Sequence, residues 1–260
     1  MAVDNTQISM LDAFQTALQT EGLFWLVLSI LAAGVVRGFS GFGSAMIIMP
    51  VASSVLSPFS ALVFLMTVEF FGPLPNLRNA LQTGHLGETA RLVLGAIVAL
   101  PLGLFALSVV SPDAFGWAVS GIVLVLLCIL LTGWRYTGPM GPRMIFGTGL
   151  LGGFSTGFVG LPGPPVIMLY MASSKPIAVI RANFLLYLFG MDLVMLPAFW
   201  ALGWLDLKAV VIGVVLIGPY IIANMVGARL FNPQAEGQFR TVAYIVIAAS
   251  AILGLPLWKG

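Results

Sequence analysis

The sequence predicts an all-α polytopic membrane protein made of two inverted-topology repeats, and three observations support this prediction. The 260-residue chain is 60% hydrophobic and only 8% charged, whereas soluble domains carry roughly 25% charged residues. Several apolar runs reach the length of about 20 residues that a membrane-spanning helix needs. A glycine-rich apolar segment at Gly34 to Pro50 returns at Gly153 to Tyr170. We therefore expect each repeat to hold a broken-helix hairpin plus about three transmembrane helices, giving about 8 to 10 membrane segments in all.

The chain begins with a polar segment, residues 1–22, which we expect to form a short helix before the first span. This segment contains Asp4, Asp12 and Glu21 but no Lys or Arg. A secretory signal peptide would instead start with a positively charged region. The first transmembrane repeat is then assigned to residues 23–138 and the second to residues 139–260.

The two repeats are defined by an internal match. Gly38 to Phe42 align with Gly157 to Leu161, and treating Pro162 as a one-residue insertion pairs Gly43 with Gly163. Further along, the alignment pairs Ser53-Ser54 with Ser173-Ser174, Pro58 with Pro176, Gly72 with Gly190, and Gly84-His85-Leu86 with Gly203-Trp204-Leu205. This recurrence over most of the chain indicates two copies of one design.

The apolar runs follow one another with short polar gaps. Uninterrupted runs lie at 23–36, 59–77, 91–110, 115–134, 182–202, 207–228 and 241–258, and broken runs lie at 34–56 and 144–172. The net charge of +2 without a basic patch argues against binding of nucleic acid. The single cysteine, Cys128, lies in an apolar run and can form no internal disulfide.

The orientation follows from Lys and Arg, which are retained in short cytoplasmic loops. Basic residues lie in the loops at 76–91, 134–143, 172–181 and 229–240. The N-terminal segment, with three acidic residues and no basic one, is expected on the outside. Residues 24–56 must then enter the membrane and return to the same side as a hairpin. The second hairpin, 144–171, enters from the opposite face. Interrupted helices that meet near the midplane are typical of secondary transporters. In the inverted model Lys208 and Lys259 lie on the outside, against the positive-inside rule. An arrangement of two parallel repeats is the competing model.

The glycine breaks suggest an anion site. A helix that restarts at Ser44 or Gly163 presents unpaired N–H groups and the positive end of its dipole, which bind anions. Lipid cannot satisfy the freed backbone groups, so the break must face protein or a wet cavity. The alternative is that Gly34, Gly38 and the following glycines only let helices pack closely.

These residues resemble a known family. Gly38 to Pro50 resembles the first signature of the TauE/SafE sulfite exporter family, and Gly149 to Tyr170 resembles its second, with Gly-Pro-Pro at 163–165. In the family these glycines are usually adjacent, whereas here other residues separate them, as Gly-Phe-Gly at 41–43 and Gly-Leu-Pro-Gly at 160–163. The resemblance covers essentially the whole chain. It implies transport of small sulfur-containing or carboxylate anions such as sulfite, sulfoacetate or isethionate.

Charged residues within the apolar runs are the further candidates, because a charge at membrane depth is costly and marks function by default. Arg37 could hold a sulfonate or carboxylate through paired hydrogen bonds, although it could instead belong to an internal ion pair. Glu69 and Asp192 are the candidates for proton coupling, with a structural partnership to Arg37 as the alternative for Glu69. The substrate-binding candidates are Arg37, Gly41, Phe42, Gly43, Ser44, Gly160, Leu161, Pro162, Gly163 and Asn183.

Two other function classes compete with a transporter. Gly38-Phe39-Ser40-Gly41 matches the motif of intramembrane serine proteases, but such an enzyme needs a base beside the serine, and the lone His85 is expected in a loop. A passive anion channel is the closer rival. We expect no enzyme activity, no cofactor and no metal site. The sequence favours a secondary transporter of the bacterial inner membrane, which binds a small anion, contacts the lipid bilayer and could form a homodimer.

Overall fold

The computed structural model describes residues 19–72, 74–132, 140–171, 173, 175–230 and 236–258, and every regular element in these residues is a helix. The N-terminal polar segment before residue 19 and the expected repeat boundary at 138/139 lie outside the described residues. The elements are α2 (Leu23–Ser40), α3 (Ser44–Val55), α4 (Pro58–Phe70), α5 (Leu74–Thr83), α6 (Leu86–Val109), α7 (Pro112–Thr132), α8 (Pro142–Val159), α9 (Gly163–Met171), α10 (Ile177–Ala201), α11 (Leu207–Leu230), α12 (Glu236–Leu253) and the 3₁₀ turn η2 (Pro256–Trp258).

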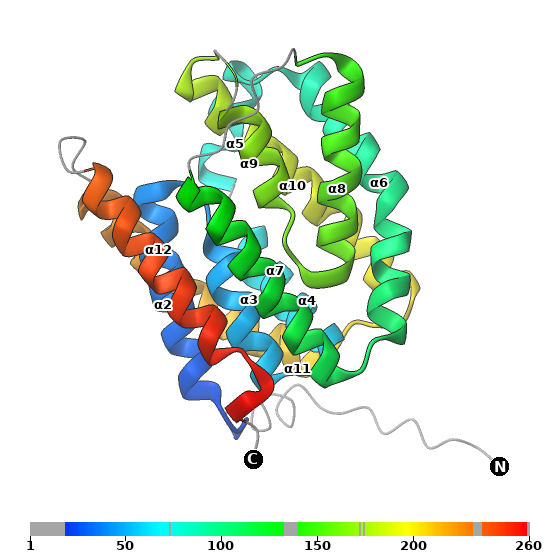
Figure 1. Cartoon of the computed structure of the whole chain (residues 1–260), viewed down its shortest axis with the longest axis vertical. Coiled ribbons are helices and arrows are strands. Elements are labelled where there is room, and N and C mark those ends of the chain that lie inside the picture. Colours follow the sequence, from blue (N-terminus) through cyan, green and yellow to red (C-terminus); the bar gives the residue numbers. More distant parts are fainter. Residues whose placement is uncertain are drawn as a thin grey trace.

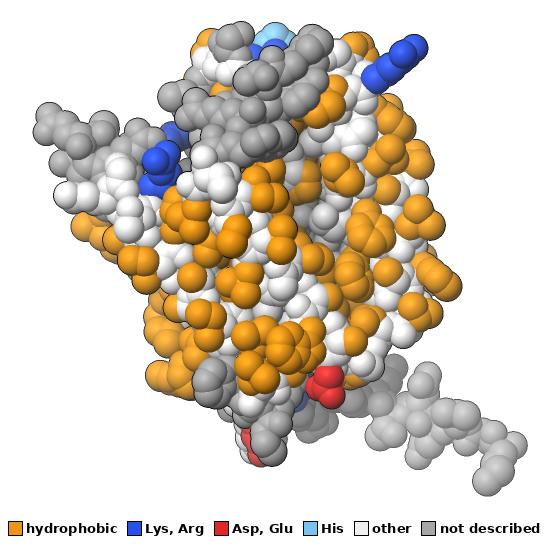
Figure 2. Space-filling view, viewed as in Figure 1, with side chains coloured by type: hydrophobic (Ala, Val, Ile, Leu, Met, Phe, Trp, Pro, Cys, Tyr) orange, Lys and Arg blue, Asp and Glu red, His pale blue; other side chains and the backbone are white. Residues whose placement is uncertain are grey.

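The helices form a multi-pass membrane protein, as predicted. Five of the described helices are long and apolar enough to cross a membrane, and three shorter helices are also apolar. On α6, the exposed stripe consists of Leu94, Val98, Leu102 and Phe105, all more than half exposed. Figure 2 shows apolar side chains over the middle of the visible face, which is the surface that lipid would cover.

One expected span is different in the structure. The run at 59–77, predicted as one crossing, forms two helices, because α4 ends at Phe70 and α5 begins at Leu74. Gly72 lies between them and is followed in the sequence by Pro73. Glycine and the residue before a proline are both disfavoured in the α conformation, and their combination at Gly72 favours the end of a helix at this point. The corresponding run of the second half remains a single helix, α10.

Both predicted breaks are present. Between α2 and α3, Gly41 has φ +79° and Gly43 has φ +92°, a left-handed conformation that glycine adopts without steric cost. Between α8 and α9, Gly160 has φ +70°. The Ser40 Oγ lies 2.6 Å from the Val36 carbonyl oxygen and 2.7 Å from that of Phe42, so this hydroxyl bridges the first break. In Figure 1, α2 starts at the lower end of the molecule and α8 starts at the upper end.

Helix α2 packs closely on α11 through small residues. A Cβ added to Gly38 would lie 2.2 Å from the carbonyl oxygen of Asn224 and 2.7 Å from the amide nitrogen of Ala228. Real Cβ atoms essentially never approach so closely, and therefore only glycine fits at this crossing. At Gly34 the nearest such atoms, 2.7 and 2.8 Å away, also belong to α11.

Helix α8 packs on α6 in a matching way. A Cβ added to Gly157, the partner of Gly38 in the sequence alignment, would lie 2.7 Å from the carbonyl oxygen of Leu100 and 2.9 Å from the amide nitrogen of Leu104. Each glycine thus faces a carbonyl oxygen and the amide nitrogen four residues further on. Gly34 and Gly38 therefore serve close packing, which was the alternative interpretation of these glycines, and Gly41 and Gly43 form the break.

Candidate functional site

The two helix breaks border one cavity, which we call the central cavity. Its walls come from the first turn of α3, the first turns of α9, single residues of α2, α4 and α7, and two residues of α10. The lining residues are Arg37, Phe42, Gly43, Ser44, Ala45, Met46, Glu69, Leu130, Pro162, Gly163, Pro164, Ile167, Phe184 and Leu188. The restarting ends of both broken helices therefore meet at a common space.

A polar network around Arg37 forms one wall of this cavity. The Arg37 Nη1 lies 2.9 Å from the Glu69 Oε1, and each of the two side chains is only 11% exposed. The same Nη1 donates to the Ser44 Oγ at 3.1 Å and to the Tyr220 hydroxyl at 3.3 Å. The Tyr220 hydroxyl in turn donates to the Glu69 Oε1 at 3.2 Å. The alternative in which Glu69 is the internal partner of Arg37 is thus observed in this structure.

Two helix N-termini border the central cavity beside Arg37. The N-cap of α3 is Gly43, which has no side chain to cap the first N–H groups of the helix. The start of α9 at Gly163 borders the same cavity. Helix N-termini carry about half a positive charge each and attract anions. Together with the Arg37 guanidinium they favour an anion, and Glu69 is the only acid among the described lining residues.

A second cavity adjoins the first, and we call it the carboxylate cavity. It shares Glu69, Pro162 and Leu188 with the central cavity, and Asp192 lies in its wall. The remaining lining residues are Leu62, Leu65, Met66, Thr156, Gly160, Met191 and Met195. Both acids predicted to take part in coupling therefore line a common space, although they come from α4 and α10.

Nine of the ten predicted substrate-binding residues divide into three groups by position. Six of them line the central cavity: Arg37, Phe42, Gly43, Ser44, Pro162 and Gly163. Gly160 lines the carboxylate cavity, as does Pro162. Gly41 is exposed and Leu161 is buried, and neither is among the lining residues of the two cavities.

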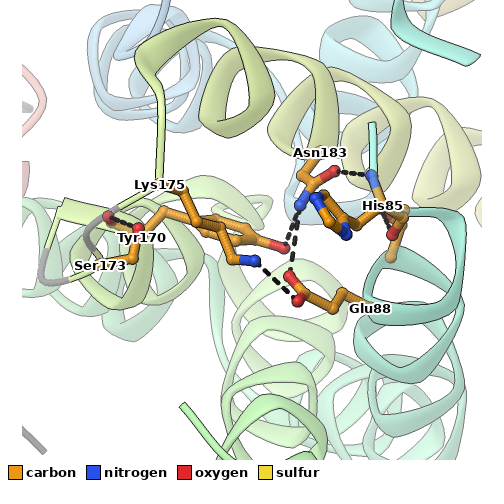
Figure 3. Close-up of polar contacts among 7 residues, drawn as sticks. His85, Glu88, Tyr170, Ser173, Lys175 and Asn183 are labelled. Atoms are coloured by element: carbon orange, nitrogen blue, oxygen red, sulfur yellow. Dashed lines mark hydrogen bonds and ion pairs between the residues drawn. The ribbon is translucent and has the colours of Figure 1, made fainter. Parts of the chain in front are cut away.

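Asn183 lies in a separate polar cluster, shown in Figure 3, where the end of α9, the start of α6 and α10 meet. The fully buried Asn183 accepts a hydrogen bond from the backbone N–H of His85 at 2.6 Å and donates to the Tyr170 hydroxyl at 3.1 Å. Lys175 Nζ pairs with Glu88 Oε1 at 2.9 Å, and the Asn183 amide lies 3.5 Å from Glu88 Oε2. These contacts fasten the end of the second hairpin to α6 and α10.

The helical geometry of α10 explains this placement. Phe184, Leu188 and Asp192 are spaced four residues apart, and all three line the cavities. With 3.6 residues per turn, Asn183 is turned about 100° away from that face. A single position along the helix thus separates the cavity from the peripheral cluster.

The family model described as sulfite exporter TauE/SafE matches residues 26–253, which include both hairpins and both cavities. The chain belongs to this family. It is also similar to a probable sulfite/organosulfonate exporter TauE of Cupriavidus necator, with 27% identity over 225 residues that cover 84% of this chain and 88% of the relative. No solved structure matches the chain.

Tyr220 was not predicted as a site residue, because a tyrosine next to Pro219 in an apolar run gives no signal of its contact with Arg37 and Glu69.

No group of three or more His, Cys, Asp or Glu residues suited to a metal ion is found in the described part of the chain.

Proposed function

We propose that the protein is a secondary active transporter of small sulfur-containing anions, such as sulfite, sulfoacetate, isethionate or a similar organosulfonate, in the bacterial inner membrane. The observation that carries this proposal is the buried Arg37, which faces a cavity bordered by two helix N-termini. The family membership and the name of the Cupriavidus necator relative, a probable sulfite/organosulfonate exporter, support the same substrate class.

Anion recognition follows from the donors around the cavity. The planar guanidinium of Arg37 presents several N–H groups in a fixed fork, which suits the oxygens of sulfite, sulfonate or carboxylate groups. The Ser44 hydroxyl and the first N–H groups of α3 can bind the remaining oxygens, whereas α9 offers fewer N–H groups because Pro164 and Pro165 have none. In this structure the Glu69 Oε1 lies 2.9 Å from the Arg37 Nη1 and forms an ion pair with the guanidinium. An anion that binds Arg37 must therefore displace the Glu69 carboxylate.

Displacement of Glu69 suggests coupling to protons. A buried carboxylate that loses its counter-ion is strongly disfavoured in its charged form, and it becomes neutral by binding a proton. The anion and a proton would then occupy the site together. The need to displace Glu69 from Arg37 also favours a saturable transporter over a passive anion channel.

The architecture proposed for this transporter is a pair of inverted repeats, residues 23–138 and 139–260, after the polar segment 1–22. The equivalent contacts of Gly38 and Gly157 support a common design of the two halves. The opposite starting ends of α2 and α8 in Figure 1 favour inverted over parallel repeats. Each repeat would supply one broken hairpin to the central cavity.

The orientation proposed is with the basic end toward the cytoplasm. In Figure 2, most of the visible Lys and Arg side chains lie toward the upper end of the molecule, and the visible acidic side chains lie at the lower end. Under the positive-inside rule the upper end is cytoplasmic. The second hairpin and the cluster around Asn183 would then lie on the cytoplasmic side.

The test is transport by the purified protein in liposomes. Uptake of sulfite, sulfoacetate, isethionate, taurine and acetate is measured with and without a pH gradient for the wild type, Arg37→Ala and Arg37→Lys. Losing a buried charged partner costs about 2 kcal/mol or more, so Arg37→Ala should lower saturable uptake at least about 30-fold. Arg37→Lys should recover part of it, because lysine keeps the charge but not the fork.

The matched control is Arg91→Ala, which removes an exposed arginine of α6 that lines neither cavity. This variant should transport like the wild type. If the wild type moves none of these anions, the proposed substrate class is wrong. Equal uptake by Arg37→Ala and the wild type would show that Arg37 is not part of the binding site. Uptake that does not saturate and carries large currents would indicate a channel.

A further inference from the structure

We propose that the carboxylate cavity is the proton site of the transporter, and that Asp192 passes a proton to Glu69 when an anion takes the guanidinium of Arg37. The proposal rests on the anion transport proposed above and adds a second, separate site to it. The central cavity holds the anion, and the carboxylate cavity holds the proton.

The arrangement of the two cavities is the first argument. Glu69 lies in the wall of both cavities, whereas Arg37 lines only the central cavity and Asp192 lines only the carboxylate cavity. Glu69 thus lies between a cation on one side and a second acid on the other. A carboxylate in this position can exchange its partner on one side for a proton from the other.

The unpaired state of Asp192 is the second argument. No hydrogen bond or ion pair to Asp192 is found within the described residues, in contrast to Glu69, which contacts Arg37 and Tyr220. The charged groups that act on Asp192 are Glu69 on α4 and Arg37 on α2. With Arg37 neutralised by Glu69, an unpaired acid in this apolar surrounding is most stable when it carries a proton.

The lining of the carboxylate cavity is the third argument, and it selects a proton rather than a metal cation. None of the described residues that line the cavity is basic, and Gly160 places the C-terminal end of α8 there, where the helix dipole is negative. A metal cation needs a shell of oxygen ligands. Six lining residues are Leu or Met, and the Thr156 hydroxyl already donates to the Gly152 carbonyl oxygen at 2.6 Å. A proton needs one carboxylate alone.

The transfer balances in atoms and charge. In the empty state the Glu69 carboxylate pairs with Arg37, and Asp192 is protonated. When the anion binds Arg37, the O–H bond at Asp192 breaks and an O–H bond forms at Glu69. Asp192 then takes a new proton from the aqueous side. The site has gained one anion and one proton, so its net charge is unchanged for a monovalent anion.

This stoichiometry sets a measurable expectation. For a monovalent anion that moves with one proton, each pH unit of gradient supports about a tenfold concentration ratio of the anion, because a pH unit is itself a tenfold ratio of protons. The membrane potential should have little effect. Isethionate is a suitable probe, since its sulfonate stays ionised near neutral pH and the pH then acts on the protein.

The experiment compares two modes of isethionate transport in liposomes for the wild type, Asp192→Asn and Asp192→Glu. Accumulation driven by a pH gradient requires net proton movement, whereas exchange of labelled for unlabelled isethionate at equal pH does not. Asp192→Asn should lose the tenfold accumulation per pH unit and keep the greater part of exchange. Asp192→Glu retains a carboxylic acid and should recover accumulation. The matched control is Asp113→Asn, the same chemical change at an exposed carboxylate of α7, which should behave like the wild type.

The outcomes separate this inference from the proposed function. If the wild type moves no anion, the proposed function fails, and the inference fails with it. If the wild type accumulates isethionate and Asp192→Asn accumulates it equally, anion transport stands and the role of Asp192 is wrong. Loss of both modes in Asp192→Asn and in Asp192→Glu would also overturn a separate proton role. Accumulation that follows a sodium gradient and is lost in Asp192→Asn would show that the cavity binds sodium.

Discussion

Substituting Gly38 by alanine would test the close crossing of α2 and α11. The new Cβ would lie 2.2 Å from the carbonyl oxygen of Asn224, and this atom cannot rotate away because it belongs to the backbone of α11. The helices would have to separate by roughly 1 Å to reach ordinary contact, and such overpacking costs about 1–3 kcal/mol. Alanine returns up to about 1 kcal/mol through its better helix propensity. Because the obstacle is helix backbone, the upper half of the overpacking range applies, and we expect a net loss of about 1–2 kcal/mol, or about 2–8 °C in the apparent melting temperature.

The assay is thermal unfolding of the purified protein in detergent, followed by tryptophan fluorescence. Gly218→Ala on α11 is the control, because no atom lies within 4 Å of a Cβ added there. This variant should be as stable as the wild type or slightly more stable. If Gly38→Ala melts together with Gly218→Ala and the wild type, the two helices are further apart than described, and the packing argument is refuted.

Two further predictions concern the cluster around Asn183. Asn183→Ala should lower stability by about 1–3 kcal/mol, because the Tyr170 hydroxyl and the His85 N–H lose a buried partner; an unchanged melting temperature would contradict the contacts in Figure 3. For the part-buried pair of Glu88 and Lys175, a double-mutant cycle with Glu88→Gln and Lys175→Met should give a coupling energy of about 0.5–2 kcal/mol. Strictly additive single effects would show that the ion pair does not form in solution.

The breaks of the membrane helices could be predicted from the sequence because they depend on local chemistry. A glycine with positive φ determines where α2 and α8 end, and the helices restart at Ser44 and Gly163, the two residues at which the sequence analysis expected a restart. The repetition of the pattern made the prediction stronger than either copy alone. The break between α4 and α5 was missed, although Gly72 and Pro73 gave the same kind of local signal.

The assembly of the site depended on contacts that the sequence pattern could not rank. Arg37 and Glu69 were each recognised as buried charges, but whether they pair is decided by how α2 and α4 pack. Tyr220 joins them from α11, about 150 residues beyond Glu69. Asn183 was among the predicted substrate-binding residues, and only the rotation of α10 about its axis shows that it faces α6.

The close contact of α2 with α11 also has a consequence for the order in which the protein folds. Gly157 meets Leu100 within one stretch of the chain, so the pair of α6 and α8 can form early. Gly38 must wait for Asn224, roughly 190 residues later, which at translation rates of about 5–20 residues per second takes on the order of 10–40 s. During this interval the glycine face of the first long helix has no partner helix. A chain that lacks α11 and α12 should therefore misfold first at α2, near its N-terminus.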